Sequence, residues 1–186
     1  NADSRGPAKN VSVFTPEILA DEILDAAAMQ INCGYHGGDS TSAKELWANC
    51  DYFSRMSCRA TADFIPAMLA MAGVTEAQVE AQGWDLTAKQ LDTMSRTEHL
   101  RWCAFHYCMG FSPMTSEEYD AREALWRQQV AAGQKSLRVG KNMKDRTHAC
   151  LIDWEALDAL SARENSLTGK NTDYKAMDAE NVLLVP

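Results

Sequence analysis

The sequence predicts an all-α protein. Apolar residues recur at helical spacing in successive segments, alternating strand patterns are nearly absent, and capping residues and glycines separate the segments. The 186 residues are 46% hydrophobic and 24% charged, which is enough apolar material for one core or two small ones. We therefore expect packed helices rather than a disordered chain.

The first helix is expected to begin at residues 15–17, where a threonine cap precedes a proline and an acidic residue. Helically spaced apolar residues follow up to a stop at Gly34. A turn at residues 37–40 separates this helix from the next, which Ser42 or Thr41 caps and which carries Leu46 and Trp47.

A third helix is expected from Cys58 to Ala72, with a kink or a break at Pro66. Thr75 then opens a short helix that ends near Gly83.

The clearest helix covers residues 87–109. Thr87 and Gln90 have the spacing of a capping box, and Gly110 is a C-terminal stop. One helical stripe carries the residues expected to face the core: Leu91, Met94, Glu98, Trp102, Phe105 and Met109.

The remaining helices are expected at residues 115–132, from 151–154 to about Ala162, and from a cap at Asn171 or Thr172 to about Val182. Loops are expected between them, including residues 166–170. Residues 133–146 predict a mobile basic loop, which is either a solvated surface loop or a segment whose cations form charge-assisted bonds to a phosphate. These cations are Lys135, Arg138, Lys141, Lys144 and Arg146.

Charge and composition exclude several classes of protein. Eighteen basic and 26 acidic residues give a net charge of −8, and no basic stripe suits a nucleic-acid backbone. No apolar run approaches the ~20 residues of a membrane-spanning helix, and residues 1–10 lack the apolar core of a signal peptide. We expect a cytoplasmic protein whose six cysteines are mostly buried free thiols.

Residues 1–14 are expected to be a disordered or tag-derived tail, and the chain is expected to be a piece of a longer protein. The sequence leaves its oligomeric state open.

A sparse internal repeat divides the chain into two halves. Each half has a helix with a polar residue and an aromatic residue three positions later, then a Trp-bearing helix, then a charged helix. Residues 113–149 form an insertion in the second half.

The second half resembles the RyR domain, the repeat module named after ryanodine receptors and also found in bacterial and phage proteins. The resemblance rests on "SRTEHLRWCAFHYCMGF", which contains Glu98, His99 and Trp102, and on "THACLIDWEAL", which contains His148 and Trp154. It covers about residues 87–181. Phe111 stands where the family more often has Trp.

The resemblance implies a two-repeat helical globule with a long inserted loop in its second half. A degenerate RyR-like half would cover residues 15–83, in which Asn32 stands where the family pattern favours His, and a C-terminal RyR domain would cover residues 84–186. Bacterial relatives carry a dinucleotide-binding domain upstream, which makes an upstream domain of the same protein the expected partner. No Gly-rich dinucleotide fingerprint lies in this chain itself.

Some RyR-domain proteins are associated with adenine nucleotides that bind between paired repeats. For this chain the resemblance implies a cleft in which Tyr35 faces Trp102, with phosphate contacts from Arg59, Arg101 and Lys170. We therefore expect a non-catalytic module, without a cofactor, that senses a small ligand such as a nucleotide. A structural or protein-interaction module, in which the same aromatic rings only join the two halves, is the alternative.

Glu98 and His99 are expected to form a structural polar lock, because a buried carboxylate needs a charged or hydrogen-bonding partner. Arg59, Arg101 and a loop N–H are the candidate partners, and the lock would join the helix to the inserted loop.

His99, Cys103 and His106 share one helical face, yet their spacing matches no usual zinc motif, and we expect no metal. An enzyme that uses Cys103 and His106 would need an oxyanion site that the sequence does not indicate, so no catalytic residue is expected.

Overall fold

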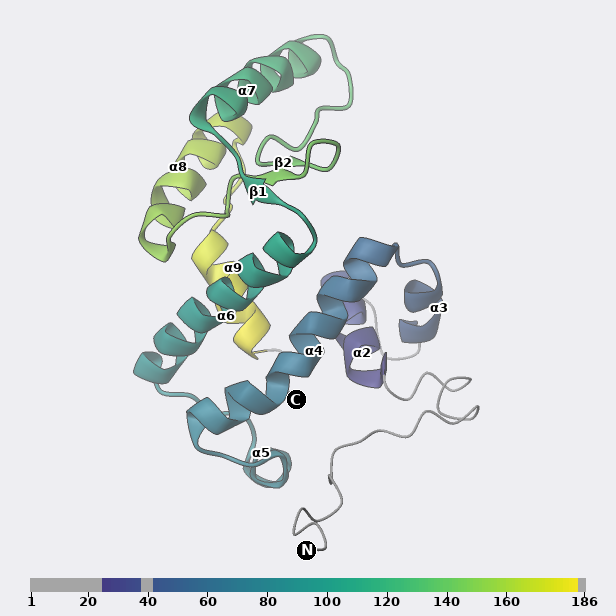
Figure 1. The fold of residues 1–186 in the computed structure, drawn as a ribbon, viewed down its shortest axis with the longest axis vertical. Helices are drawn as coiled ribbons and strands as arrows, with labels where there is room; N and C mark the ends of the chain where they lie inside the picture. The colour runs from purple at the N-terminus through teal and green to yellow at the C-terminus, as the bar shows by residue number, and fades with distance from the viewer. Residues whose placement is uncertain (1–24, 38–41, 184–186) are drawn as a thin grey trace, which may run out of the picture. The chain divides into compact units, whose positions relative to one another are not determined.

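The computed structural model describes residues 25–37 and 42–183, and these residues are predominantly helical (Figure 1). The predicted all-α class is confirmed. The expected tail at 1–14, the helix start at 15–17 and most of the turn at 37–40 lie outside the described residues. The two-repeat arrangement stays a prediction.

The chain divides into two compact units, residues 1–63 and 64–186. The division lies inside a long helix rather than between residues 83 and 84, where the sequence analysis put it. The reason is that residues 64–83 contribute apolar side chains to the core of the second unit.

The first unit contains α2 (Ala26–Tyr35), α3 (Ala43–Ala48) and the first part of α4 (Tyr52–Ala72). Trp47 of α3 is fully buried. The guanidinium groups of two α4 residues lie over its ring, with Cζ 5.0 Å from the ring centroid for Arg55 and 5.7 Å for Arg59.

Helix α4 begins six residues before the predicted start at Cys58, since Asp51 caps it. The Ser54 N–H donates to Asp51 Oδ1 over 3.0 Å. Of the kink or break predicted at Pro66, the break does not occur, because the helix continues through this proline to Ala72, and the kink stays a prediction. Met68 and Leu69 are buried in the next turn, and their packing compensates for the hydrogen bond that proline cannot make.

The second unit adds the following elements in order: α5 (Glu76–Gln82), α6 (Ala88–Cys108), β1 (Ser112–Pro113), α7 (Ser116–Ala131), β2 (Lys141–Asn142), β3 (Thr147–His148), the 3-10 helix η2 (Trp154–Ala156), α8 (Leu157–Thr168) and α9 (Tyr174–Leu183). Helix α9 lies along α6 (Figure 1). Helix α8 lies beside α7, since Arg163 of α8 forms ion pairs with Asp120 and Glu123 of α7.

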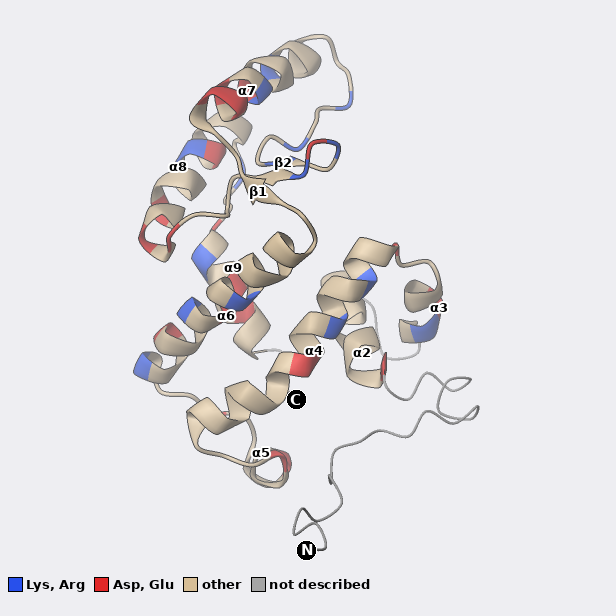
Figure 2. Ribbon diagram, viewed as in Figure 1, with Lys and Arg blue, Asp and Glu red and all other residues tan. Residues whose placement is uncertain are grey.

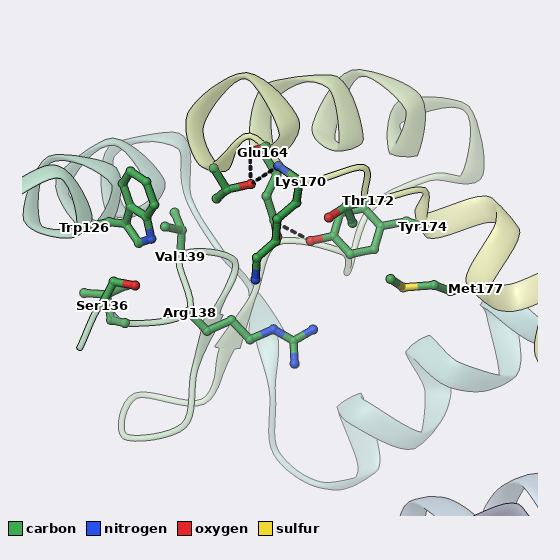
Figure 3. Close-up of a pocket in the computed structure, with 11 residues that line it drawn as sticks. Trp126, Ser136, Arg138, Val139, Glu164, Lys170, Thr172, Tyr174 and Met177 are labelled. Atoms are coloured by element: carbon green, nitrogen blue, oxygen red, sulfur yellow. Dashed lines mark hydrogen bonds between the residues drawn. The ribbon is translucent and has the colours of Figure 1, made fainter. Parts of the chain in front are cut away.

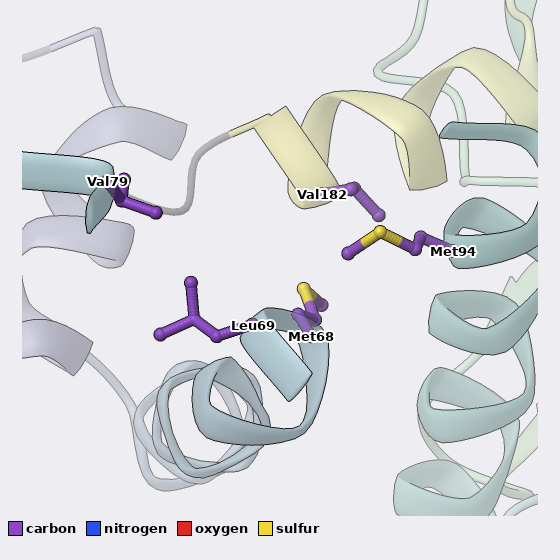
Figure 4. Packing of buried hydrophobic residues seen from close by; sticks show 5 residues of the cluster. All are labelled: Met68, Leu69, Val79, Met94 and Val182. Carbon is purple, nitrogen blue, oxygen red and sulfur yellow. The ribbon is translucent and has the colours of Figure 1, made fainter. Parts of the chain in front are cut away.

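One apolar core of this unit joins four helices (Figure 4). Met68 and Leu69 of α4, Val79 of α5, Met94 of α6 and Val182 of α9 are its buried members. Burying a side chain of this size stabilises the fold by about 1.5–3 kcal/mol. This core explains why the end of α4 belongs to the second unit.

Local signals set several helix ends. The predicted capping box of α6 is present, since the Gln90 N–H donates to Thr87 Oγ1 and Gln90 Oε1 accepts from the Thr87 N–H. Helix α8 ends at Thr168, well past the expected end at Ala162, and the C-cap residue Gly169 has the left-handed φ of 69°. Asp173, rather than Asn171 or Thr172, caps α9.

The inserted segment contains α7 and a small three-stranded sheet in the order β1-β3-β2. Strand β1 pairs parallel with β3, and β2 pairs antiparallel with β3. The loop at 133–146 was expected to be mobile, but Arg122 of α7 fixes its second part. The guanidinium donates to the carbonyl oxygens of Arg138, Val139 and Lys141 over 2.7–2.8 Å.

Candidate functional site

The face of α6 that packs against its neighbours is wider than the predicted stripe. Its buried residues are Met94, Ser95, Glu98, His99, Cys103 and His106. Trp102, Phe105 and Met109 are only half-buried. The polar members of this face therefore need partners from other elements.

Glu98 is completely buried and forms an ion pair with Arg101 one turn later on α6. Arg101 Nε and Nη2 donate to the two carboxylate oxygens of Glu98, each over 2.6 Å. Asn181 of α9 also donates to Glu98, over 3.4 Å. Burial raises the pKa of Glu98, while Arg101 acts in the opposite direction.

His99 links α6 to two other segments. Its Nδ1 lies 3.1 Å from Asp178 Oδ2 of α9, and its Nε2 lies 2.8 Å from the carbonyl oxygen of Ile152. Burial alone would lower the pKa of His99, but the bonds to Asp178, Cys103 and Ile152 outweigh it and raise the pKa to about 10. The polar lock thus joins α6 to α9 and to Ile152, and not to the inserted loop as predicted.

Trp102 lies among histidine rings. Its ring centroid is 3.8 Å from that of His106 and 4.9 Å from that of His148. Burial lowers the pKa of His106 to about 4 and that of His148 to about 2, so both rings are neutral near pH 7. This cluster is an internal packing arrangement.

A cavity of about 490 Å³ opens elsewhere in the second unit, where the basic loop meets the segment between α8 and α9 (Figure 3). Ser136, Leu137, Arg138 and Val139 line it from the loop, Trp126 from α7, Glu164 and Thr168 from α8, and Lys170, Thr172, Tyr174 and Met177 from the last segment. A volume of this size is typical of small-molecule sites.

Two cations reach into this cavity. The side chains of Arg138 and Lys170 point toward the same part of it from opposite walls (Figure 3). Basic residues also recur along the loop before β3 (Figure 2). No carboxylate of the described residues forms an ion pair with either side chain.

Among the described residues that line the cavity, Glu164 is the acidic one, and it already has a partner. The Tyr174 hydroxyl donates a short hydrogen bond to Glu164 Oε2. Burial is the largest of the effects that raise the pKa of this tyrosine, so its hydroxyl stays protonated and available to the carboxylate. The cavity therefore offers positive charge from Arg138 and Lys170 and aromatic surface from Trp126 and Tyr174.

The predicted ligand residues fall in different places. Tyr35 is 52% exposed at the end of α2 in the first unit. Arg59 of the same unit forms an ion pair with Asp25, over 2.7 Å from Nε to Oδ1. Arg101 is paired with buried Glu98, and the ring of Trp102 packs against the rings of His106 and His148. Only Lys170 lines the 490 Å³ cavity, and the expected meeting of Tyr35 with Trp102 stays a prediction.

Sequence reasoning identified part of this site. Arg138 was one of the cations of the basic loop to which phosphate binding was assigned. Trp126 and Tyr174 were not singled out as ligand residues, because an aromatic residue in an amphipathic helix reads first as a core residue.

Among the described residues, no group of three or more His, Cys, Asp or Glu side chains is arranged to hold a metal ion. No helix in the described parts of the chain is both long and apolar enough to cross a membrane. Comparison with protein-family models, with curated proteins and with solved structures gave no match.

Proposed function

We propose that this chain is a non-catalytic module that binds a small anionic ligand, such as an adenine nucleotide, in the 490 Å³ cavity. The observation that carries the proposal is the convergence of Arg138 and Lys170 on one cavity in which the Glu164 carboxylate accepts a hydrogen bond from Tyr174. Guanidinium and ammonium groups form charge-assisted bonds to phosphate oxygens.

Aromatic side chains supply the complementary contact for a base. Trp126 is half-buried in the cavity wall, and Tyr174 forms part of the same wall. Stacking of a base on an aromatic ring is worth about 1–3 kcal/mol. A nucleotide would satisfy both the cations and the aromatic surface, whereas inorganic phosphate would use only the cations.

The resemblance to the RyR domain agrees with such a role. We propose that the module serves a larger protein, with an upstream domain as its partner, and that ligand binding shifts the population of its conformations. A ligand shifts such an equilibrium only by its difference in affinity for the two states. Arg59 and Arg101 are left out of the proposed phosphate site, because their guanidinium groups form ion pairs with Asp25 and Glu98.

Isothermal titration calorimetry with ATP, AMP and adenosine tests the proposal. We expect AMP or ATP to bind with a millimolar or lower Kd and adenosine to bind more weakly. The single variants Arg138→Ala and Lys170→Ala should each weaken nucleotide binding about tenfold or more, since a hydrogen bond to a charged group contributes about 1.5–3 kcal/mol.

Lys144→Ala is the matched control. It removes the same charge from an exposed position of the basic loop outside the cavity wall, and binding should stay within about twofold of the wild type. The absence of nucleotide binding at millimolar concentration, or an equal loss in Lys144→Ala, would contradict the proposal.

One observation favours the alternative, an interaction module with no small ligand. Leu100 and Tyr107 lie two turns apart on the same face of α6 and are 68% and 50% exposed. Exposed apolar side chains on one face are typical of contact surfaces. If no nucleotide binds, and if Leu100→Ser abolishes an association that is seen with the wild type, this alternative gains support.

A further inference from the structure

A second cavity in the same unit has a volume of about 440 Å³ and lies between α6 and residues 151–155. Most of its walls are apolar, and these side chains are Leu100, Tyr107, Leu151, Ile152 and Trp154. His99 and Cys103 of α6 also line it, as do the charged residues Arg96, Asp153 and Glu155. A thiol thus lies at the wall of an apolar cavity, which a small apolar compound can enter.

The thiol belongs to a group of three neighbouring side chains, Cys103, His99 and Asp178. Cys103 Sγ lies 3.5 Å from His99 Nε2, and His99 Nδ1 lies 3.1 Å from Asp178 Oδ2. The side chains of His99 and Asp178 are 4% and 11% exposed. The sequence analysis paired Cys103 with His106, but the structure instead places His99 beside the sulfur, with a carboxylate behind the ring.

The hydrogen bonds of His99 indicate its charge. A carbonyl oxygen and a carboxylate both accept hydrogen bonds, so both ring nitrogens must donate, and His99 is then an imidazolium ion. It cannot remove the thiol proton, because it already carries both hydrogens. Its contribution at Cys103 is a fixed positive charge, with Nε2 3.5 Å from Sγ, and reactive cysteines typically lie in electropositive surroundings of this kind.

We propose that Cys103 is a covalent attachment site for an apolar electrophile that contains an α,β-unsaturated carbonyl group. The thiol proton passes to solvent, and the sulfur lone pair forms a bond to the β-carbon. The carbon–carbon π pair moves to the α-carbon, which then takes a proton from solvent. The product is a thioether, with no leaving group and no change in the number of protons bound.

This class of electrophile fits the site for two reasons. The apolar part of the wall, formed by Leu100, Ile152 and Trp154 among others, offers contact surface to an apolar molecule. Addition also needs no general acid to expel a leaving group, which suits a site whose histidine uses both ring hydrogens in existing bonds.

The chain contains its own reference thiols. Cys108 lies on the same helix and is exposed, without a neighbouring histidine bond. Cys150 is buried in the same unit, and burial raises the pKa of its thiol to about 12. The labelling rate of Cys108 reports simple exposure, whereas the labelling rate of Cys150 reports opening of the unit.

The test is the labelling of the whole chain with N-ethylmaleimide, a small unsaturated carbonyl compound, followed by peptide mass spectrometry over time. Cys103 should react at least ten times faster than Cys150, and at a rate comparable to that of Cys108 despite its lower exposure. His99→Gln should slow Cys103 at least tenfold and leave Cys108 unchanged. Arg96→Gln is the matched control. It removes a positive charge from the same cavity wall, but His99 remains beside the Cys103 sulfur, so the labelling rate of Cys103 should change less than twofold.

A Cys103 labelling rate equal to that of Cys150 in the wild type would overturn the proposal, because the thiol would then react only when the unit opens.

If His99→Gln does not fold, Tyr107→Trp replaces it as a cavity-filling variant at an exposed position. This variant should slow Cys103 and leave Cys108 and Cys150 unchanged. An unchanged Cys103 rate would likewise overturn the proposal.

Discussion

Removal of the positive charge from the Glu98–Arg101 pair is expected to destabilise the second unit strongly. The Glu98 side chain is 0% exposed and that of Arg101 is 10% exposed, and two bonds of 2.6 Å join them. In Arg101→Met the methylene stem is largely kept, but the buried carboxylate retains, among the residues that the structure describes, only the hydrogen bond from Asn181. Loss of one partner of a buried pair costs about 3–5 kcal/mol.

The effect has a defined pH dependence. Burial raises the pKa of Glu98 even with Arg101 present, and without Arg101 the pKa rises further. A carboxyl whose pKa is raised in the folded state lowers the free energy of unfolding as the pH rises from its unfolded pKa, ~4.3, to its folded pKa. The deficit of Arg101→Met should therefore be larger at pH 8 than at pH 5, where Glu98 can take up a proton.

Urea denaturation followed by circular dichroism at both pH values measures this deficit. Arg127→Met is the matched control, because Arg127 pairs with Glu123 at 61% side-chain exposure, and surface pairs contribute about 0–1 kcal/mol. A deficit below about 1 kcal/mol for Arg101→Met at pH 8, or one that grows toward pH 5, would refute the reasoning.

Three further predictions concern other parts of the chain. Burial holds the pKa values of His106 and His148 at about 4 and about 2, so the folded state resists protons that the unfolded state binds below pH 6.5. The free energy of unfolding should therefore fall between pH 6.5 and 5 by about 2 kcal/mol for each histidine. Urea denaturation at several pH values measures this fall, which should be smaller in His106→Phe than in the wild type. A fall of the same size in both proteins would contradict the prediction. Pro66→Ala should stabilise α4 by about 1–3 kcal/mol in urea denaturation, because it restores a backbone donor inside a helix, and a loss of stability would show that the proline ring itself packs. Arg122→Ala should make trypsin cleave the basic loop at least ten times faster, because three carbonyl bonds are lost, whereas Arg127→Ala should not.

Helix starts were predictable where a capping pair is written locally in the sequence. Thr87 with Gln90 forms the capping box expected from its spacing, and the helix expected to open at Thr75 does so, with a capping box to Gln78 that was not predicted. The start of α4 at Asp51 was missed because the residues after it lack clear apolar periodicity. The small sheet was missed because strands of two residues carry no alternating pattern.

The candidate site depends on contacts that are distant in sequence. Lys170 and the basic loop were both assigned to phosphate binding, but nothing local shows that Arg138 and Lys170 reach the same cavity. The ordering of that loop depends on Arg122, which lies 16 to 19 residues from the carbonyl groups it holds. Long-range contacts of this kind cannot be read from composition or periodicity.

The position of the ligand tests the central claim most directly. The indole N–H signals of the five tryptophans can be followed in ¹⁵N–¹H NMR spectra during titration with AMP, with Trp126→Phe to assign one of them. The account predicts that the Trp126 signal shifts with AMP concentration, while the Trp84 signal, whose indole N–H donates to the Val182 carbonyl oxygen, stays in place. A Trp126 signal that does not move at saturating AMP, or a shift confined to Trp102, would contradict it.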